Sequence, residues 1–329
     1  MAKVALVVGC SHSTFLYTPP ETWNEIRGQR ALSPGVPRDS DEVNQEKYRR
    51  CMEAFSILKG KIELVRPDVL LIFGDDQLEQ FQLNCMPGFG IYLGEKVQGR
   101  GRPLKHLPKN SGLSAADFWR GTKGHPDLAK ELASGLVKKG FDICFSLRLP
   151  DDTRGMGHAF MYPAYYLTPA YNVPILPFFI NCYFPPQPTG KRCYEVGMAV
   201  RQVIEECPMD LKVAVVGSGG LWHMPDVPGA YLDEQFDRTV LQCVADGSGR
   251  RMGEYFDSFE WPGPEASGET AKKLLGVTGM KGGVGSGVGE TRNWIAAASV
   301  VEGIRGTVVD YVPVYASPCG MGFAFWELV

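Results

Sequence analysis

Histidine is scarce in this sequence, and several features that define other protein classes are absent. The 329 residues include only five histidines, and the nine cysteines never form a Cys-x-x-Cys pair, which argues against a zinc finger or a disulfide framework. The formal net charge is only -3, so no basic excess favours nucleic-acid binding. No apolar run reaches the roughly 18 residues that a membrane span needs. These absences predict a cytoplasmic globular protein that contacts neither membranes nor nucleic acid.

Short apolar runs that end in glycine or polar residues alternate with helical patterns. The continuous runs are typical of strands buried on both faces, and they lie at residues 4–8, 69–73, 141–147, 173–180, 213–216 and 307–315. Apolar residues recur at helical spacing in residues 46–66, 126–139, 194–206, 232–245 and 290–301. This alternation predicts an α/β fold over residues 1–329, a single layered domain. We expect a mostly parallel or mixed central sheet flanked by helices, with the active site at the carboxyl ends of the strands.

Three stretches do not follow this alternation. Residues 19–44, 85–114 and 252–289 are expected to form long loops that shape a pocket, because proline, glycine or charged residues dominate them. The last stretch ends in a glycine-dense segment, but it lacks the Gly-Lys-Ser/Thr ending of a phosphate-binding loop. Residues 217–222 lack the third glycine of a dinucleotide-binding loop. Neither segment therefore predicts a nucleotide site.

Three of the five histidines follow apolar runs. Because ligands of open α/β sheets bind beyond the carboxyl ends of the strands, we expect His12, His158 and His223 to converge. A ferrous site that activates oxygen uses two histidines and one carboxylate on one face of the metal. His12, Glu290 and a residue of the polar segment 74–77 match this chemistry. The remaining histidines then suit acid–base roles, since histidine titrates near neutral pH.

Short motifs occur in a fixed order between residues 9 and 295. They are GCSHS (9–13), TPPETW (18–23), GDDQLEQF (74–81), GHAFMYP (157–163), NCYFPP (181–186), RCY (192–194), GSGGLWH (217–223), LDEQFDR (232–238) and ETRNWI (290–295). In order and spacing they resemble the class III extradiol ring-cleaving dioxygenases, the relatives of the protocatechuate 4,5-dioxygenase catalytic subunit. The second motif is most similar to the single-chain branch that cleaves 3-O-methylgallate and gallate.

The resemblance implies an oxidoreductase of aromatic-compound catabolism. Such an enzyme holds one Fe(II) ion and opens the ring of a gallate-like or 3-O-methylgallate-like catecholic acid with both atoms of O₂. Carried over by position, it implies metal ligands at His12, Gln77 and Glu290 and catalytic roles for His223 and His158. His223 would act as base and acid, and His158 would hydrogen-bond the substrate. The long loops would replace the separate small subunit of some relatives, so we expect a homodimer of this chain alone.

Gln77 departs from the family pattern, because it stands where protocatechuate-type members have their second ligand histidine. A neutral amide oxygen is a weaker ligand for Fe(II) than imidazole. Gln77 could still ligate, Asp76 could replace it or support the ligands from outside, or the site could bind metal weakly. The substitution also leaves two alternatives open: a protein-binding module of the same fold and a metal-assisted lyase or hydrolase. The strand-end histidines and Glu290 disfavour a binding module, which has no need of them.

Overall fold

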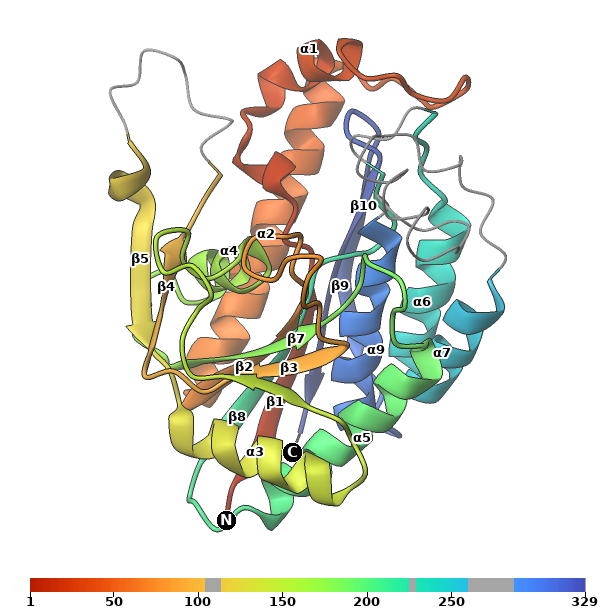
Figure 1. The fold of residues 1–329 in the computed structure, drawn as a ribbon. Coiled ribbons are helices and arrows are strands. Elements are labelled where there is room, and N and C mark those ends of the chain that lie inside the picture. Colours follow the sequence, from red (N-terminus) through yellow and green to blue (C-terminus); the bar gives the residue numbers. More distant parts are fainter. Residues whose placement is uncertain (104–113, 225–228, 260–286, 329) are drawn as a thin grey trace.

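The computed structural model describes residues 1–103, 114–224, 229–259 and 287–328. These residues form an α/β fold around a mixed eight-stranded sheet, which confirms the predicted fold class (Figure 1). In order across the sheet, the strands are β6 (Cys144–Ser146), β3 (Phe89–Tyr92), β7 (Ile175–Ile180), β2 (Val69–Gly74), β8 (Lys212–Ser218), β1 (Lys3–Cys10), β10 (Cys319–Glu327) and β9 (Thr307–Val314). A separate antiparallel ribbon pairs β4 (Lys96–Arg100) with β5 (Trp119–Lys123).

The four central strands, β7, β2, β8 and β1, run parallel to one another. Nearly all of their residues are buried, because helices cover both faces of the sheet. Their apolar runs identified all four strands in the sequence. Since the strands share one direction, their carboxyl ends lie along one edge of the sheet, and the polar segments that follow them are neighbours.

The outer strands were harder to predict. Residues 141–147 do not form a strand buried on both faces, because only β6 is extended there, at the sheet edge, and its Phe145 is 62% exposed. Antiparallel β10 was not predicted, because Gly320 and Gly322 interrupt its apolar pattern. Gly320 is required by close packing, since a Cβ there would lie 1.7 Å from Oδ2 of Asp237.

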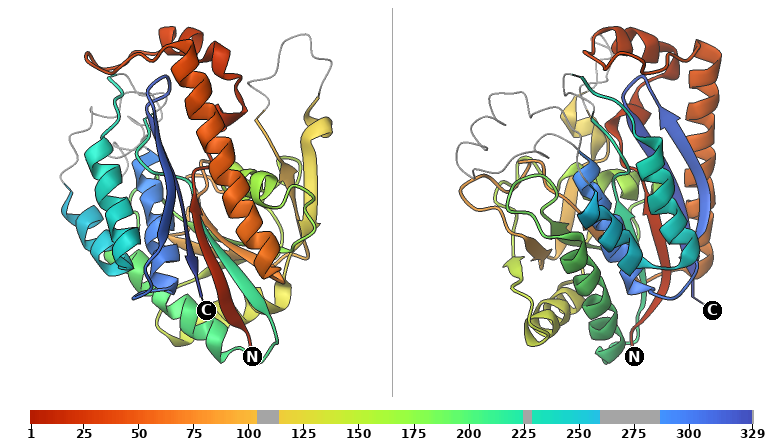
Figure 2. Two further views of the ribbon diagram at one scale, coloured as in Figure 1. Left: turned by 180° about the vertical axis from the view of Figure 1, so that it is seen from behind. Right: turned by 90° about the vertical axis from the view of Figure 1, so that its right-hand side faces the viewer.

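Helices pack on both faces of the sheet, which Figure 2 shows edge-on in its right-hand view. The helices on one face are α2 (Asp41–Val65) and α4 (His158–Leu167). Those on the other face are α3 (Pro126–Lys138), α5 (Gly190–Glu206), α6 (Glu234–Asp246), α7 (Gly249–Ser258) and α9 (Thr291–Val300). Alternation along a strand separates the two cores: in β1, Leu6 and Val8 face α2 whereas Val7 faces α9. The five predicted helices are present with shifted ends, and α4, which contains Pro163, was not predicted.

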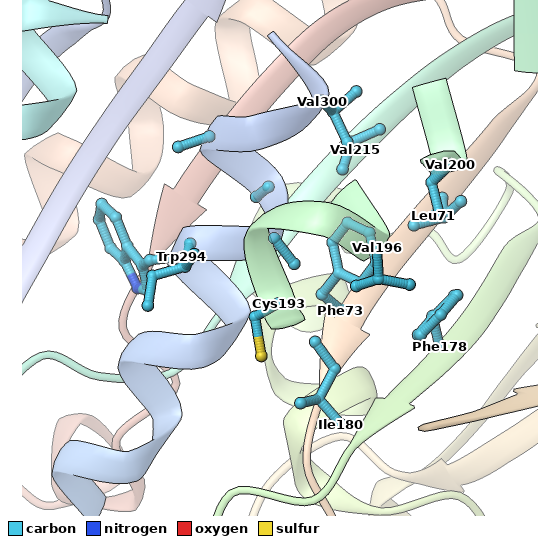
Figure 3. Packing of buried hydrophobic residues seen from close by; sticks show 14 of the residues in the cluster. Leu71, Phe73, Phe178, Ile180, Cys193, Val196, Val200, Val215, Trp294 and Val300 are labelled. Carbon is cyan, nitrogen blue, oxygen red and sulfur yellow. The ribbon is translucent and has the colours of Figure 1, made fainter. Parts of the chain in front are cut away.

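The core beneath α5 and α9 continues to the edge where the parallel strands end. Figure 3 shows side chains of both helices against those of β2, β7 and β8, among them Leu71, Phe73, Phe178, Ile180, Val196, Val200, Val215 and Trp294. Trp294 also donates its indole N–H to the carbonyl oxygen of Gly219 at 2.8 Å. The same packing that buries α9 therefore fixes the segment that follows β8.

The stretches expected as loops contain regular structure. Residues 19–44 include η2 (Pro20–Thr22), α1 (Trp23–Gly28) and the start of α2, because buried Trp23 anchors them. Residues 85–114 include β3 and β4, so neither stretch is a plain loop. In the third stretch, residues 260–286 lie outside the described residues, and η4 (Gly287–Glu290) follows them. The remaining short helices are η1 (Thr14–Tyr17) and η3 (Ala115–Phe118). Among the helices that the structure describes, none is long and apolar enough to cross a membrane.

Candidate metal centre

Polar side chains from four strand ends and one helix start meet at the carboxyl edge of the parallel strands. His12 follows β1, Asp75 follows β2, Tyr183 follows β7 and His223 follows β8, while Glu290 ends η4. Nε2 of His12 lies 3.3 Å from Oε2 of Glu290, and Nε2 of His223 lies 3.2 Å from Oε1 of the same carboxylate. The structure therefore brings together the strand-end groups that the sequence singled out, around a glutamate from the far end of the chain.

Three of these residues form a cluster with the composition of a metal site. One ligand atom each of His12, Asp75 and Glu290 lies within 4.8 Å of the others, and all three residues are buried. One imidazole and two carboxylates suit divalent ions such as Fe(II) and Mn(II). Asp75 belongs to the segment 74–77 that the sequence pointed to, but the motif comparison drew attention to its neighbours instead.

Hydrogen bonding fixes the orientation of the His12 ring. Ser218, the last residue of β8, donates its hydroxyl hydrogen to the carbonyl oxygen of Ala159 at 2.5 Å. Its oxygen must then accept a hydrogen from Nδ1 of His12, which lies 2.9 Å away. The lone pair of His12 is therefore on Nε2 and faces Glu290. Proteins commonly prepare a ligand histidine for a metal in this way.

Ala159 can accept that hydrogen bond because of a proline in its own helix. In α4, the N–H that would bond to the Ala159 carbonyl belongs to residue 163, which is proline and has no N–H. The hydroxyl of Ser218 takes the place of the missing helical donor. Pro163 thus connects α4 to the His12 ring through Ser218.

The two aspartates after β2 have different environments. Asp76 accepts backbone N–H groups from Glu79, Gln80 and Phe81, so its carboxylate stabilises the turn. Asp75 is fully buried, and neither of its carboxylate oxygens receives a hydrogen bond from another described residue. Of these two aspartates, Asp75 is the one that lies in the cluster with His12 and Glu290. A buried carboxylate without partners fits a bound cation.

The electrostatics of the cluster follow from burial and from neighbouring charges. Burial and the adjacent Glu290 raise the pKa of Asp75 well above its usual range. Burial also acts to raise the pKa of Glu290, but His223 and His12 outweigh it and hold that pKa well below its usual range. Glu290 therefore supplies a negative charge at the site, and its two oxygens face different histidines.

Two glycines after β8 allow the backbone to approach Glu290. The N–H of Gly220 donates to Oε2 of Glu290 at 2.8 Å. Gly219 has a φ of 103°, and a Cβ there would lie 2.2 Å from the same oxygen and 2.8 Å from Cε1 of His12. Glycine is thus required at 219 both by conformation and by space. The glycine-rich motif that does not fit a dinucleotide loop instead makes room for the metal-facing residues.

Gln77 lies at the mouth of the cluster, where it acts as a hydrogen-bond donor. Its side-chain nitrogen donates to the hydroxyl oxygen of Tyr183 at 2.9 Å and to Oε1 of Glu290 at 3.2 Å. Tyr183 in turn donates its hydroxyl hydrogen to the same Glu290 oxygen. Tyr183 stands in the NCYFPP motif, but an apolar strand followed by tyrosine gives no sign of this contact.

His158 borders the cluster from the start of α4. Its ring packs edge-on to that of His12 with centroids 4.6 Å apart. Nδ1 of His158 lies 2.8 Å from Oε2 of Glu79, which also accepts the backbone N–H of His158. Burial acts to lower the pKa of His158, but the Glu79 charge and hydrogen bond outweigh it and raise that pKa to about 9. Glu79, which the sequence did not single out, therefore positions this histidine.

His223 is held in a defined orientation on the opposite side of Glu290. Its Nδ1 lies 3.0 Å from the carbonyl oxygen of Leu221, which can only accept a hydrogen, so Nδ1 carries one. Nε2 faces Oε1 of Glu290 and lies 3.4 Å from the hydroxyl oxygen of Tyr183. A Cβ on Gly287 would lie 1.6 Å from this Nε2, so the ring packs directly against the η4 backbone.

A pocket of about 270 Å³ opens next to His158. Its lining residues are Leu78, Glu79, Arg100, Arg154, Gly155, Met156, His158 and Tyr162. Arg154 pairs with Asp151 and donates to the Leu78 carbonyl, whereas Arg100 forms no ion pair with any described residue. The pocket lining therefore contains two cationic side chains, Arg100 and Arg154, together with His158 of the cluster border. Sequence reasoning missed Arg100 because it treated β4 as part of a loop, although the alternating burial of β4 is typical of a strand.

Arg292, from the last sequence motif, and His125 have structural roles. Arg292 donates to the carbonyl oxygens of Pro188 and Gly289 and lies 4.7 Å from the ring centroid of Phe256. His125 caps α3, because its Nδ1 accepts the N–H of Leu128. His106 lies outside the described residues.

Comparison with known proteins identifies the family of this chain. Residues 35–317 match the family model described as the catalytic LigB subunit of aromatic ring-opening dioxygenase. The match covers most of the chain, so the protein belongs to this family, as the motifs predicted.

Individual relatives are more distant. The chain is 30% identical over 187 residues to 2,3-dihydroxyphenylpropionate/2,3-dihydroxicinnamic acid 1,2-dioxygenase of Photorhabdus laumondii, which covers 56% of the chain and 51% of the relative. It is 37% identical over 103 residues to gallate dioxygenase of Pseudomonas putida, covering 30% and 29%. The chain thus spans about half or less of the length of these two relatives. A solved structure of an uncharacterized protein, JW3007 from Escherichia coli K12, aligns over 98% of the chain with 12% identity and a TM-score of 0.49.

Proposed function

We propose that this protein is an Fe(II)-dependent extradiol dioxygenase that opens the ring of a catecholic aromatic acid with O₂. The observation that carries the proposal is the pair of His12 and Glu290: the imidazole lone pair faces a fully buried carboxylate in a chain of the ring-opening dioxygenase family. The family implies a metal, and the unpartnered oxygens of buried Asp75 fit one.

His12 and Glu290 would hold the ion, and the segment after β2 offers Gln77 and Asp75 as candidates for a third protein ligand. When bound, the ferrous ion supplies open positions at which a catechol and O₂ bind side by side. Ser218 keeps the His12 lone pair directed at this point, and Gly220 keeps Glu290 in place. These hydrogen bonds would hold both ligands in orientations suited to the ion.

His223 is placed to take the proton that a catechol hydroxyl loses on binding. Its Nδ1 is committed to the Leu221 carbonyl, so Nε2 is the nitrogen that faces the cluster and can accept a hydrogen. His158 lines both the cluster and the pocket, and Glu79 fixes its ring, so it is placed to hydrogen-bond a substrate oxygen. Both assignments agree with the roles that the resemblance implies.

The arginines that line the pocket beside His158 favour a substrate with a carboxylate group. A catechol ring bound at the cluster with its side chain in the pocket would bring its carboxylate toward Arg100 and Arg154. Guanidinium groups match carboxylates in both charge and shape. Gallate and dihydroxyphenylpropionate, the substrates in the names of two relatives, both carry such a group.

The function is tested by oxygen uptake. The protein is loaded with Fe(II) without oxygen and then mixed with gallate, 3-O-methylgallate, protocatechuate, 2,3-dihydroxyphenylpropionate or catechol. We expect O₂ consumption with at least one acid and incorporation of both ¹⁸O atoms into a ring-opened product. His12→Ala should abolish it, while His125→Ala, at a histidine outside the cluster, should not.

Three results would contradict the proposal. If the protein neither consumed oxygen with any of these compounds nor bound any of them, catechol cleavage would be excluded. Turnover that does not depend on oxygen would favour a metal-assisted lyase or hydrolase instead. A protein that binds no metal would favour the binding-module alternative.

The proposed contact between Arg100 and a substrate carboxylate is tested separately. Losing a charge-assisted hydrogen bond costs about 1.5–3 kcal/mol, so Arg100→Gln should raise KM for the preferred acid about tenfold or more. KM for catechol, which has no carboxylate, should not change. Equal effects on both substrates would refute the assignment.

We further propose a cytoplasmic homodimer of this chain without a separate small subunit. The nine cysteines are all free thiols, which supports a reducing compartment. The long segments 19–44, 85–114 and 252–289 support a catalytic chain that needs no small partner. Light scattering on the purified chain tests the dimer, and an active monomer would contradict it.

A further inference from the structure

The segment after β2 offers two candidate ligands, and the geometry distinguishes them. We propose that Asp75, not Gln77, is the third protein ligand, so that one imidazole and two carboxylates hold the metal. This inference rests on the proposed function only in taking the bound group to be a divalent metal ion.

The spacing of the three ligand atoms fits a common ion. Metal–ligand distances of about 2.0–2.2 Å place two ligands of one ion at most about 4.4 Å apart. The atoms of His12, Asp75 and Glu290 already lie within 4.8 Å of one another. His12 Nε2 and Glu290 Oε2, at 3.3 Å, are separated as neighbouring ligands would be.

The state of Asp75 calls for a partner. A fully buried carboxylate that receives no hydrogen bond from another described residue is costly as an anion. A cation held between Asp75 and Glu290 would satisfy both carboxylates. In the following turn, the backbone N–H groups of Glu79 and Gln80 bond to Asp76 and not to Asp75.

Gln77, by contrast, already has a role. Its side-chain nitrogen faces Glu290 and donates to that carboxylate and to Tyr183, so the amide oxygen, the atom that would bind a metal, is turned away from Glu290. Gln77 is also exposed, whereas the three clustered residues are buried. It therefore positions Glu290 from the outside and leaves ligation to the buried aspartate two residues earlier.

Two carboxylates alter the character of the site. They neutralise a divalent ion, whereas a site of two histidines and one carboxylate would leave one positive charge. Oxygen-rich sites also favour Mn(II) relative to imidazole-rich ones. We therefore expect this chain to bind Mn(II), which serves as a stable substitute for Fe(II) in binding measurements.

The test is Mn(II) titration of the metal-free, full-length protein by calorimetry. We expect Asp75→Asn, which keeps the size of the side chain, to lower affinity by more than the roughly 100-fold range of a supporting residue, and His12→Ala to do the same. Gln77→Ala should lower it only about tenfold. Thermal unfolding of the metal-free variants checks that each variant folds.

Two results would overturn the assignment. One is Asp75→Asn binding Mn(II) as wild type does. The other is Gln77→Ala losing as much affinity as His12→Ala. The readout is independent of catalysis: if iron-loaded wild type consumed no oxygen but Asp75→Asn still lost Mn(II), the proposed function would fail and the ligand assignment would stand. A wild-type chain that binds neither Mn(II) nor Fe(II) would overturn both.

Discussion

Ser218 offers a direct test of how the protein prepares His12 for metal binding. The Ser218→Ala substitution removes the acceptor for the Nδ1 hydrogen of His12 and the donor to the Ala159 carbonyl. Each buried polar group left unpaired costs about 1–3 kcal/mol, so the free energy of unfolding of the metal-free protein should fall by about 2 kcal/mol or more. Loss of the partner that orients a ligand histidine lowers metal affinity about 10–100-fold, or about 1.4–2.7 kcal/mol.

Urea unfolding and Mn(II) calorimetry measure the two effects separately. Ser299→Ala is the matched control, because Ser299 is also fully buried and donates to a helix carbonyl, that of Ile295, but makes no contact with the cluster. The control should lose some stability and keep its metal affinity. An Mn(II) affinity of Ser218→Ala within about twofold of the wild-type affinity would contradict this reasoning. It would show that His12 does not need the Ser218 hydrogen bond to direct its lone pair.

Three further substitutions distinguish effects on metal affinity from effects on the stability of the core. Gly219→Ala places a Cβ 2.2 Å from the Glu290 carboxylate at a φ of 103°, and it should cost about 1–3 kcal/mol in urea unfolding and reduce Mn(II) affinity by calorimetry. An unchanged Mn(II) affinity would show that the segment after β8 shifts to accommodate the methyl group without moving Glu290. Tyr183→Phe removes a donor to Glu290, and calorimetry should show about a tenfold loss of affinity with little change in stability. Leu71→Ala, in the centre of the sheet, should cost about 2–5 kcal/mol in urea unfolding and leave affinity intact, and a loss of affinity would contradict the separation.

The parts of the fold that were predictable are those where burial alone decides the structure. The runs at β1, β2, β7 and β8 are apolar because helices cover both faces, and that pattern is visible in any single run. β10 escaped prediction because its glycines are selected by neighbours elsewhere in the chain, such as Asp237. The length and burial of the strand at β6 were overestimated, because an apolar run can also lie at an exposed sheet edge.

The sequence predicted which strand ends form the candidate site, but not which side chain of each segment faces it. The motifs identified His12 and Glu290, and the parallel sheet explains why they meet. Which residue of 74–77 faces the metal depends on the turn that follows β2. There Asp76 is committed to backbone N–H groups, and Asp75 is left facing the cluster. An aspartate followed by a tight turn is a signal of such a role, but distinguishing two adjacent aspartates requires the backbone path.

Pro163 has a consequence for the order in which the protein assembles. The carbonyl that it leaves open in α4 reaches Ser218 only when that helix has docked against the sheet, and only then is the His12 ring held in one tautomer. The proposed ligands come from segments as distant along the chain as β1 and η4. Metal binding at the proposed site would therefore depend on the docking of α4, which holds the His12 ring through Ser218.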